Sequence, residues 1–439
     1  MKKIISFLNT DIKIINSYFL FTIVLIILVC VGYSSYALFS FTKTSTNVIE
    51  GTVGELKKNI DTSGANAPVL ASNMIPVYYD ETNSVWKKSD VSNMDKTNPW
   101  YSYNSTGEYK GMWANAVTVT TTNRTTYLNA APGTTIPMTD INTMWVWIPR
   151  FNAVTPSNYN GGTQAKPNAI DVTFVKQNET AIDAFTFGTK QLSGFWYGKF
   201  EIGGTLASPC TNETCNVSNI VVKPNVSSLR SQKVSSFFYA SRSMEQTGNS
   251  FGFVKDEVDT HMSKSNEWGA VAYLTQSIYG RCTSSTTCTE IGINNNSGYL
   301  TGYGAPAGSN DSVTNGAYDT SLGKAASTTN NIYGIYDMSG GAYEYVMGVY
   351  TNTIGESGFS SLPDTKYYNN YTETSYTEHA LTETKNWYSD SAGFVNSINP
   401  WFKRGGNYGN VTYAGVFYFS INDGNSYINY SSRLVISNE

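Results

Sequence analysis

The sequence has few charged residues. Asp, Glu, Lys and Arg make up 14% of its 439 residues, against about 25% in ordinary globular proteins. The formal net charge is −4, so no basic excess is present to neutralise phosphates, and we expect no nucleic-acid partner. Neutral polar residues and 32 tyrosines take the place of charges. Such a composition suits an extracellular protein that recognises ligands through hydrogen bonds and stacking.

Histidine is scarce as well. His261 and His379, the two histidines of the chain, stand in separate polar contexts without a metal-ligand spacing, and we expect both at the surface rather than on a metal. No Gly-x-Ser-x-Gly turn accompanies them, which argues against a Ser-His-Asp hydrolase. A glycosidase with paired carboxylates stays open, because no pattern singles out a pair.

Cysteine is limited to five residues. Cys30 lies in the apolar N-terminal segment, and the other four form two close pairs, Cys210 with Cys215 and Cys282 with Cys288. Neither spacing is the Cys-x-x-Cys of a structural zinc site. We expect two local disulfides, which is typical of an exported protein, although cross-pairing between the two loops stays open.

The N-terminus carries an export signal. Lys2, Lys3 and Lys13 precede an apolar run over residues 18–33, and this pattern directs membrane insertion. Residues 1–40 are therefore a signal peptide, cut after Ala37, or a membrane anchor with a cytoplasmic N-terminus. Both alternatives place the rest of the chain at the cell surface or in the secreted fraction.

The exported part divides by composition. Residues 41–73 are polar without periodicity and indicate a linker. Short aromatic and β-branched runs at 75–80, 84–88 and 113–119 predict strands, so residues 74–140 are a β-rich leading module or an N-terminal extension of the main domain. In the main domain, residues 141–439, we expect short helices at 234–244 and at 267–279, the second capped by Ser265 and Asn266.

One turn carries two carboxylates. Residues 334–346 read GIYDMSGGAYEYV, where Asp337 and Glu344 lie among aromatic residues and the glycines break any regular element. A buried carboxylate needs donors or a cation. Arg404 and Arg433 are the expected partners. The positions expected to be structural are Gly334, Asp337, Gly340, Glu344, Arg404, Gly405, Gly406 and Arg433.

This turn resembles the Gly-Leu-Tyr-Asp-Met-x-Gly-Asn-Val-Trp-Glu-Trp signature of the formylglycine-generating-enzyme (sulfatase-modifying factor) family. Blocks at 144–151, 194–202, 268–274 and 403–406 fit the same family in order. The resemblance covers about the last two thirds of the chain and implies an α+β, loop-rich variant of the C-type lectin fold. Family members use oxygen ligands for calcium near this signature. Gly341 stands where they have Asn, so structural calcium is compatible, but hydrogen bonding of Asp337 and Glu344 is favoured.

The same resemblance implies that the family's oxidation chemistry is missing. That chemistry needs two cysteines shortly after the Arg-Gly-Gly segment to bind copper. Asn410 and Gly415 occupy those places, and no cysteine follows Cys288. We therefore expect a non-catalytic protein without a cofactor.

The C-terminal stretch, residues 407–432, is rich in Tyr, Asn, Ser and Gly and lacks Lys, Glu, Gln, Met and Trp. It is similar to an antibody paratope and resembles the variable segment of proteins diversified by retroelements. Residues 414–419 predict a core strand with alternate residues inward. The expected ligand contacts are Asn407, Tyr408, Asn410, Tyr413, Tyr418, Asn422, Asn425, Tyr427 and Tyr430.

These observations predict a surface-displayed protein that binds an extracellular protein or glycan, with membrane association through the N-terminal segment if that segment is uncleaved. Two alternatives remain. One is an exported enzyme of the same superfamily with different chemistry. The other is a structural envelope or fibre component, because residues 36–52 also resemble the export region of bacterial biofilm-fibre proteins.

Overall fold

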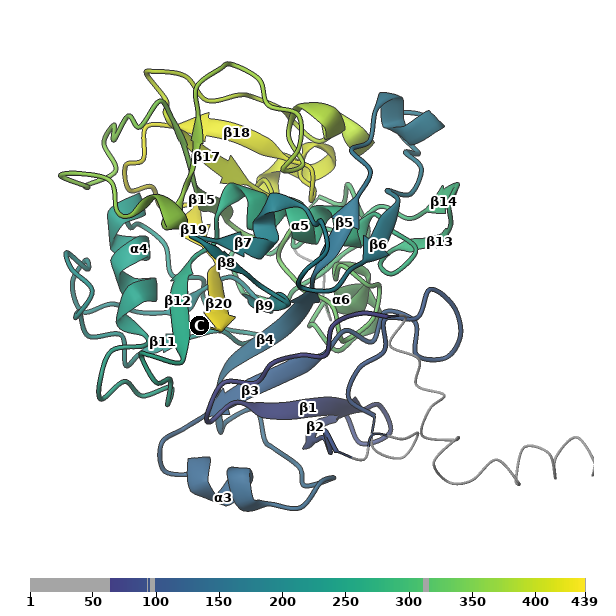
Figure 1. The fold of residues 1–439 in the computed structure, drawn as a ribbon, viewed down its shortest axis with the longest axis vertical. Coiled ribbons are helices and arrows are strands. Elements are labelled where there is room, and N and C mark those ends of the chain that lie inside the picture. Colours follow the sequence, from purple (N-terminus) through teal and green to yellow (C-terminus); the bar gives the residue numbers. More distant parts are fainter. Residues whose placement is uncertain (1–63, 93, 95–98, 311–315, 439) are drawn as a thin grey trace, which may run out of the picture. The chain divides into compact units, whose positions relative to one another are not determined.

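The computed structural model describes residues 64–92, 94, 99–310 and 316–438 (Figure 1). The expected signal peptide or anchor over 1–40, and the expected linker as far as residue 63, lie outside the described residues. Within the part described, no helix combines the length and apolar character needed to cross a bilayer. The part of the chain that the structure describes is mostly β with a few short helices.

A seven-stranded sheet forms the larger layer. In spatial order its strands are β12 (Val258–Met262), β20 (Leu434–Asn438), β9 (Gly194–Gly198), β4 (Ile141–Pro149), β3 (Asn115–Val119), β1 (Ile75–Asp80) and β2 (Val85–Lys88). Strand β4 lies at the centre, and Trp145 and Trp147 on it are at most 1% exposed. Both faces of this strand are covered, which is why its sequence is a continuous apolar run rather than an alternating one.

The first three strands belong to this same sheet. The runs expected at 75–80, 84–88 and 113–119 form β1, β2 and β3, and β3 pairs with β4 in the register Ala116 to Trp145. Residues 74–140 are thus an N-terminal extension of the main sheet, the second of the two alternatives given above. Residues from 64 onward also pack on it, since Trp147 Nε1 donates to Asn66 O at 3.2 Å and Trp196 Nε1 to Val69 O at 2.7 Å. The expectation of a free linker is wrong for residues 64–73.

A second sheet is built around β15 (Tyr343–Tyr350). Its path is β16 (Asn369–Tyr371), β15, β17 (Trp401–Arg404) and β18 (Phe419–Asn422), and β19 (Tyr430–Ser432) pairs with the start of β15. Strands β17 and β18 lie at the end of the molecule opposite β1 and β2 (Figure 1). Only Arg433 separates β19 of this sheet from β20 of the larger one. The chain therefore passes from one sheet to the other at a single residue.

Two helices occur where the sequence predicts them. Helix α4 spans Val234–Ser243, and α5 spans Ser265–Thr275. Helix α5 begins two residues early because Glu267 accepts from the backbone N–H of Lys264 at 2.8 Å and fixes Lys264 as its cap. The expected cap residues Ser265 and Asn266 therefore lie inside the helix. Its eleven residues are all buried, which explains the absence of an amphipathic pattern.

The remaining elements are short. The other α-helices are α3 (Arg124–Asn129) and α6 (Ser321–Ala325). The 3₁₀ turns are η2 (Asn158–Gly161), η3 (Asp183–Phe185), η4 (Thr365–Tyr367), η5 (Thr382–Thr384), η6 (Trp387–Ser389) and η7 (Tyr408–Tyr413). Two-stranded ladders join β5 (Phe151–Ala153) to β6 (Val172–Phe174), β7 (Thr186–Phe187) to β8 (Lys190–Gln191), β10 (Gly203–Gly204) to β11 (Ile220–Val221), and β13 (Cys282–Ser284) to β14 (Thr287–Cys288).

Both local disulfides are confirmed. Cys210 bonds Cys215, and Cys282 bonds Cys288. The second bond joins β13 to β14 across their hairpin. Cross-pairing between the loops is excluded.

Candidate ligand-binding surface

The two carboxylates of the turn at 334–346 are both buried, and each has partners. Glu344 on β15 accepts from Arg433 Nε at 2.9 Å and from Arg433 Nη2 at 2.5 Å. The same guanidinium donates to Gly198 O at the end of β9 and to Tyr336 O. Arg433 therefore ties the small sheet to the large one, and the expectation that it partners a carboxylate of this turn is confirmed. Burial raises the pKa of Glu344 to about 7, against the opposing effect of Arg433.

Asp337 finds its donors elsewhere. It accepts from Gly302 N at 2.8 Å and from Asn294 Nδ2 at 2.8 Å. Burial raises the pKa of Asp337, while Arg433 and these hydrogen bonds lower it. Asp337 thus anchors the loop around 294–302 to the turn, a structural role that agrees with the sequence interpretation.

Arg404 does not pair with a carboxylate, and this expectation is wrong. Its guanidinium donates to His379 O at 3.4 Å and to Ala380 O at 2.8 Å. The reason is geometric: residues 378–380 form a turn with left-handed backbone, whose carbonyls face the end of β17. Gly405 and Gly406, which follow Arg404, have φ of +79° and +74°, so glycine is required there to turn the chain away from the sheet.

Asn410 and Gly415, which stand where the resembled family has its two cysteines, both have structural roles. Asn410 Oδ1 accepts from Asn407 N at 2.8 Å and closes the capping box of η7. At Gly415, an added Cβ would lie 2.2 Å from Asp390 Oδ2, and that oxygen accepts from Phe417 N at 3.0 Å. A buried carboxylate fills the space that a side chain at 415 would need.

The C-terminal segment 407–430 is attached to the turn at both ends. Tyr408 N donates to Gly341 O at 2.9 Å, and Tyr343 N donates to Asn429 O at 2.9 Å. The strand expected over 414–419 is wrong: residues 414–418 form a buried turn, and β18 begins only at Phe419. All six residues are buried without alternation, because Trp268 Nε1 and the Asp390 carboxylate hold their backbone in place of a neighbouring strand.

The expected contact residues divide into three groups. Tyr413 and Tyr427 are exposed, at 57% and 37%. Asn407, Tyr408, Asn410, Asn422 and Asn425 are partly exposed. Tyr418 and Tyr430 are buried, at 4% and 6%, which leaves little of either ring accessible to a ligand.

The buried tyrosines have a packing role. Tyr418 packs on Tyr343, and Tyr430 packs on Tyr343, Tyr345 and Tyr427 with ring centroids 4.9–5.1 Å apart. The amide of Asn422 is likewise used internally: its Nδ2 donates to Tyr430 OH, and its Oδ1 accepts from Tyr345 OH. These residues support the exposed loop from beneath.

Several residues at this surface were missed by the sequence analysis. Ile428 is 72% exposed beside Tyr427. Arg230 lies 4.0 Å from the Tyr299 ring, and the Tyr299 ring meets Tyr408 edge-on at 5.1 Å. The one available signal was the length of the loop from 292 to 327, which contains Tyr299. Arg230, which contacts the Tyr299 ring, also donates to Ile428 O. We define the surface formed by Tyr299, Tyr408, Tyr427 and Ile428 as the tyrosine face.

Lys403 extends beneath the tyrosine face. Its Nζ donates to Tyr430 OH at 2.7 Å and lies 4.1 Å from the centre of the Tyr343 ring. Burial lowers the pKa of Lys403 to about 8. This cation holds two of the supporting rings together.

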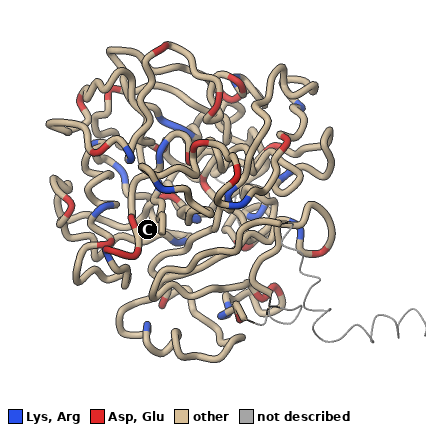
Figure 2. The backbone as a smooth tube through the Cα atoms, in the orientation of Figure 1, with Lys and Arg blue, Asp and Glu red and all other residues tan. Residues whose placement is uncertain are grey.

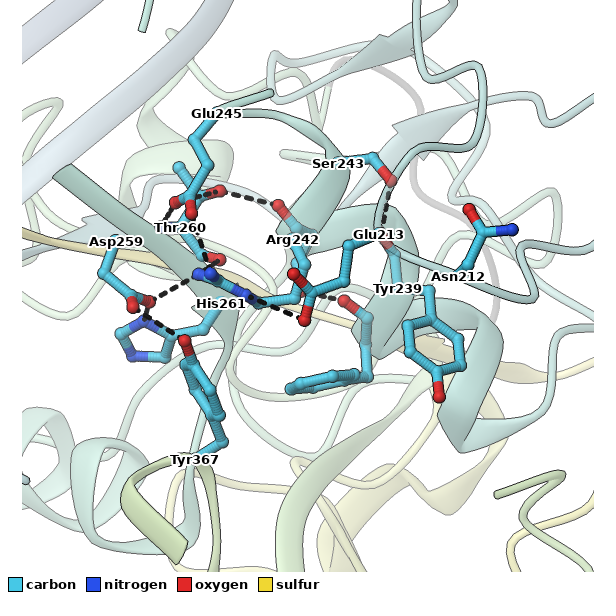
Figure 3. Close-up of polar contacts among 12 residues, drawn as sticks. Asn212, Glu213, Tyr239, Arg242, Ser243, Glu245, Asp259, Thr260, His261 and Tyr367 are labelled. Carbon is cyan, nitrogen blue, oxygen red and sulfur yellow. Dashed lines mark hydrogen bonds and ion pairs between the residues drawn. The ribbon is translucent and has the colours of Figure 1, made fainter. Parts of the chain in front are cut away.

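A separate buried network surrounds His261 on β12 (Figure 3). His261 Nδ1 lies 3.1 Å from Asp259 Oδ1, and Nε2 lies 3.0 Å from Glu267 Oε1. Arg242 of α4 bridges Asp259 and Glu245, both at 2.7 Å. Both histidines are buried, His261 at 0% and His379 at 5% exposed, so the prediction of surface histidines is wrong. Their carboxylate partners, distant in sequence or unmarked by a motif, satisfy the rings inside.

No family model matches the chain, and no curated protein does. Among solved structures, Treponema denticola variable protein 1 aligns at 13% identity over 66% of this chain and 95% of its own, with a TM-score of 0.26. The Major Tropism Determinant P3c Variant aligns at 11% identity over 86% of this chain and 98% of its own, also at 0.26. The Major Tropism Determinant M1 Variant aligns at 11% identity over 86% of this chain and 96% of its own, with a TM-score of 0.25. At these values the alignments carry neither fold nor function over to this chain.

Proposed function

We propose that the chain is a non-catalytic recognition protein with a lectin-type body, displayed at the cell surface or secreted, that binds an extracellular protein or glycan through the tyrosine face. One observation carries the proposal: Tyr427 and Ile428 are 37% and 72% exposed on a loop whose supporting residues are buried. A ligand that covers these side chains would bury their exposed apolar surface, and this burial favours binding.

The tyrosine face is supported rigidly. Arg230 donates to Ile428 O, and Ser231 N donates to Tyr427 O at 3.1 Å. Loops fixed before binding lose less conformational entropy when a ligand arrives. The arrangement therefore resembles a preorganised paratope.

Charge contributes little to this proposal. Lys and Arg are interspersed with Asp and Glu along the backbone (Figure 2), and the net charge is −4. Recognition by stacking and hydrogen bonding fits such a surface better than recognition by charge. Two disulfides agree with an oxidising, extracytoplasmic compartment.

The direct test is a screen of the labelled chain against glycan and extracellular-protein arrays. Binding should be lost in Tyr427→Ser and Ile428→Ser and kept in Tyr376→Ser, because Tyr376 has the same 37% exposure as Tyr427 but lies outside the tyrosine face. Binding that is unchanged by Tyr427→Ser and by Ile428→Ser would refute the proposal. Chemical conversion of an array component by the chain would refute it as well. Filament formation by the purified chain would favour the fibre alternative.

Genetic diversification of the tyrosine face is a further part of the proposal. It rests on the residue usage of 407–432 and has its own test. The coding sequence should have a nearby, almost identical copy that differs only at adenines and lies beside a reverse-transcriptase gene. Absence of such a copy would leave a binding surface of fixed sequence.

A further inference from the structure

Arg230 is a partly exposed cation at the tyrosine face. Its guanidinium carbon lies over the Tyr299 ring, 4.0 Å from the ring centre, and its Nη1 donates to Ile428 O. The ring and the carbonyl hold the planar group at two points. The guanidinium is therefore oriented before any ligand arrives, whereas the side chain of an ordinary surface arginine changes rotamer freely.

Two strained residues maintain this arrangement. Ser231 and Tyr299 have φ of +61° and +56°, a region in which residues other than glycine are strained. The N–H of Ser231 donates to Tyr427 O at 3.1 Å, so the backbone conformation that follows Arg230 also holds the exposed Tyr427. Such strain gathers at ligand sites, and here it lies at the residues that position the guanidinium and the ring beneath it.

The guanidinium of Arg230 keeps a donor that a ligand can reach. No described carboxylate forms an ion pair with it, and Nη1 is the nitrogen that has a hydrogen-bond partner among the described residues. Nε is buried without a partner. Nη2 has none either, but unlike Nε it keeps solvent-accessible surface. A fixed cation with an accessible N–H suits an anionic oxygen as its acceptor.

Tyr299 and Tyr408 add neutral groups beside this cation. Both side chains are partly exposed, and their rings meet edge-on with centroids 5.1 Å apart. Burial raises the pKa of Tyr299, so its hydroxyl keeps its proton. The tyrosine face therefore offers a ligand both a charged and a neutral donor.

The charges around the loop at 423–430 also favour an anionic ligand. Lys403, which lies beneath the loop, donates to Tyr430 OH at 2.7 Å and has no carboxylate partner among the described residues. Asp423 is the carboxylate of this loop, and its donors are Asn425 N at 2.9 Å and Tyr427 OH at 3.1 Å. Neither cation is compensated by it. A ligand carboxylate would supply the missing negative charge.

The neighbours of Arg230 favour a sugar acid over an acidic protein segment as the source of that carboxylate. Ser426 and Tyr427 are exposed and Asn429 is partly exposed, and their hydroxyl and amide groups both donate and accept, as sugar hydroxyls do. Exposed Ile428 and the ring of Tyr427 provide apolar surface for the face of a sugar ring. A uronic acid combines the carboxylate, the hydroxyls and such a face in one residue.

We infer that the ligand of the tyrosine face is an acidic glycan, and that Arg230 selects it by donating from Nη2 to a uronic acid carboxylate. This inference rests on the proposed function, because it names the ligand class of the same surface. A charge-assisted hydrogen bond is about twice as strong as a neutral one. One arginine is therefore enough to select the acid, while stacking and neutral hydrogen bonds supply the remaining affinity.

The test measures binding of the full chain to oligogalacturonate, hyaluronan and alginate, each as the free acid and as the methyl ester, which is neutral. At least one free acid should bind, and its ester should bind about tenfold more weakly or less. Arg230→Gln should bring the ratio of acid to ester affinity close to one. Lys385→Gln, which removes an exposed positive charge outside the tyrosine face, should leave the ratio unchanged.

The ratio distinguishes selection from support of the loop. Arg230 also holds Ile428, and a disturbed loop would weaken acid and ester alike. A ratio unchanged in Arg230→Gln, equal binding of acid and ester, or no binding of any free acid would each overturn the inference. Equally tight binding of poly-L-glutamate would overturn it too, because the carboxylate would then belong to a protein ligand.

These outcomes leave the proposed function standing, provided that some ligand still binds and is lost in Tyr427→Ser. Uronate binding that Tyr427→Ser leaves unchanged would have a different meaning. It would place the glycan site outside the tyrosine face, and would contradict both the inference and the proposed function.

Discussion

At the scale of single residues, Arg433 is the link between the two sheets. It is 0% exposed, and it is paired with a fully buried Glu344. Replacing Arg433 by Met keeps most of its volume but leaves Glu344 buried without its cation, and breaking a buried pair in this way costs about 3–5 kcal/mol. We expect a loss of that size in the free energy of unfolding, measured by urea denaturation.

The exposed Lys385→Met provides the control for Arg433, since surface changes usually stay within about 0.5 kcal/mol. A loss no greater than that of the control would mean that Arg433 does not hold the sheets together.

Gly415 makes a second prediction at this scale. Gly415→Cys places a Cβ within 2.3 Å of both Asp390 oxygens, so the buried carboxylate must move, and overpacking of this kind costs about 1–3 kcal/mol. The double substitution Asn410→Cys with Gly415→Cys should therefore lower the denaturation midpoint instead of rebuilding an oxidase. Gly409→Ala is the matched control, because its nearest neighbour would be 3.6 Å away. Equal midpoints for Gly415→Cys and Gly409→Ala would contradict this account.

The sequence predicted some of these residue roles and not others. A carboxylate partner for Arg433 in the turn was predictable, because a buried carboxylate among aromatics requires donors or a cation. Arg404 was not, since its partners are carbonyls presented by a left-handed turn that no local pattern reveals. The burial of Tyr418 and Tyr430 could not be predicted either, because the sequence of a polar stretch does not show whether a tyrosine ring is buried beneath the surface or exposed on it.

At the scale of elements, β12 carries a histidine that the fold keeps charged. Both ring nitrogens of His261 face carboxylates, Asp259 and Glu267, so both must carry protons. Burial lowers the pKa of His261, but these two carboxylates outweigh it and leave the pKa raised. The other groups facing the ring are Phe187, stacked at 4.8 Å, and Tyr367.

A histidine whose pKa is raised in the folded state stabilises that state. Its contribution to the free energy of unfolding is fully present below the unfolded-state pKa of about 6.5 and is lost as the pH rises through the folded-state pKa. Glu344, with its pKa raised to about 7, acts in the same direction, because the folded state holds its proton more tightly. We therefore expect the free energy of unfolding to fall between about pH 5 and about pH 8. Urea denaturation across that range measures it.

His261→Gln should make this pH dependence shallower, because it removes one of the titrating groups. If that variant fails to fold, the imidazole signals in proton NMR offer an independent test, since the chain has two histidines and His379→Gln assigns them. A His261 signal that titrates below about pH 6.5, or stability that rises over the same range, would disprove the charged form.

The elements themselves were predictable to different degrees. Strands β1 to β3 and helix α4 have local patterns that the structure keeps. Helix α5 lost its expected cap residues to Lys264 and Glu267, because tertiary burial of the whole helix removed the polar face that marks a boundary. The prediction of a strand at 414–419 was wrong for a related reason. The backbone of this segment is held by a tryptophan N–H and a carboxylate, and an apolar run buried in this way has the same sequence pattern as one buried in a sheet.

At the scale of the whole molecule, the leading segment is inseparable from the main sheet. Strand β3 hydrogen-bonds along β4, whose residues 141–146 would become an open edge without it. Trp145 and Trp147 would lose part of their cover, together with the buried residues of β1 and β3. Each large side chain exposed costs about 1.5–3 kcal/mol, and residues 74–140 contain many buried ones, so their combined loss exceeds the roughly 5–15 kcal/mol of stability that a domain has.

This predicts the outcome of two truncations. A chain that starts at residue 60 keeps every described contact, and should unfold in one cooperative transition with the near-ultraviolet circular dichroism of packed tryptophans. A chain that starts at residue 141, the boundary expected from composition, should lack both signals and aggregate through the β4 edge. A cooperative transition in the shorter chain would show that 74–140 is a separate module, because only a body with its own closed core could survive the loss of three adjoining strands.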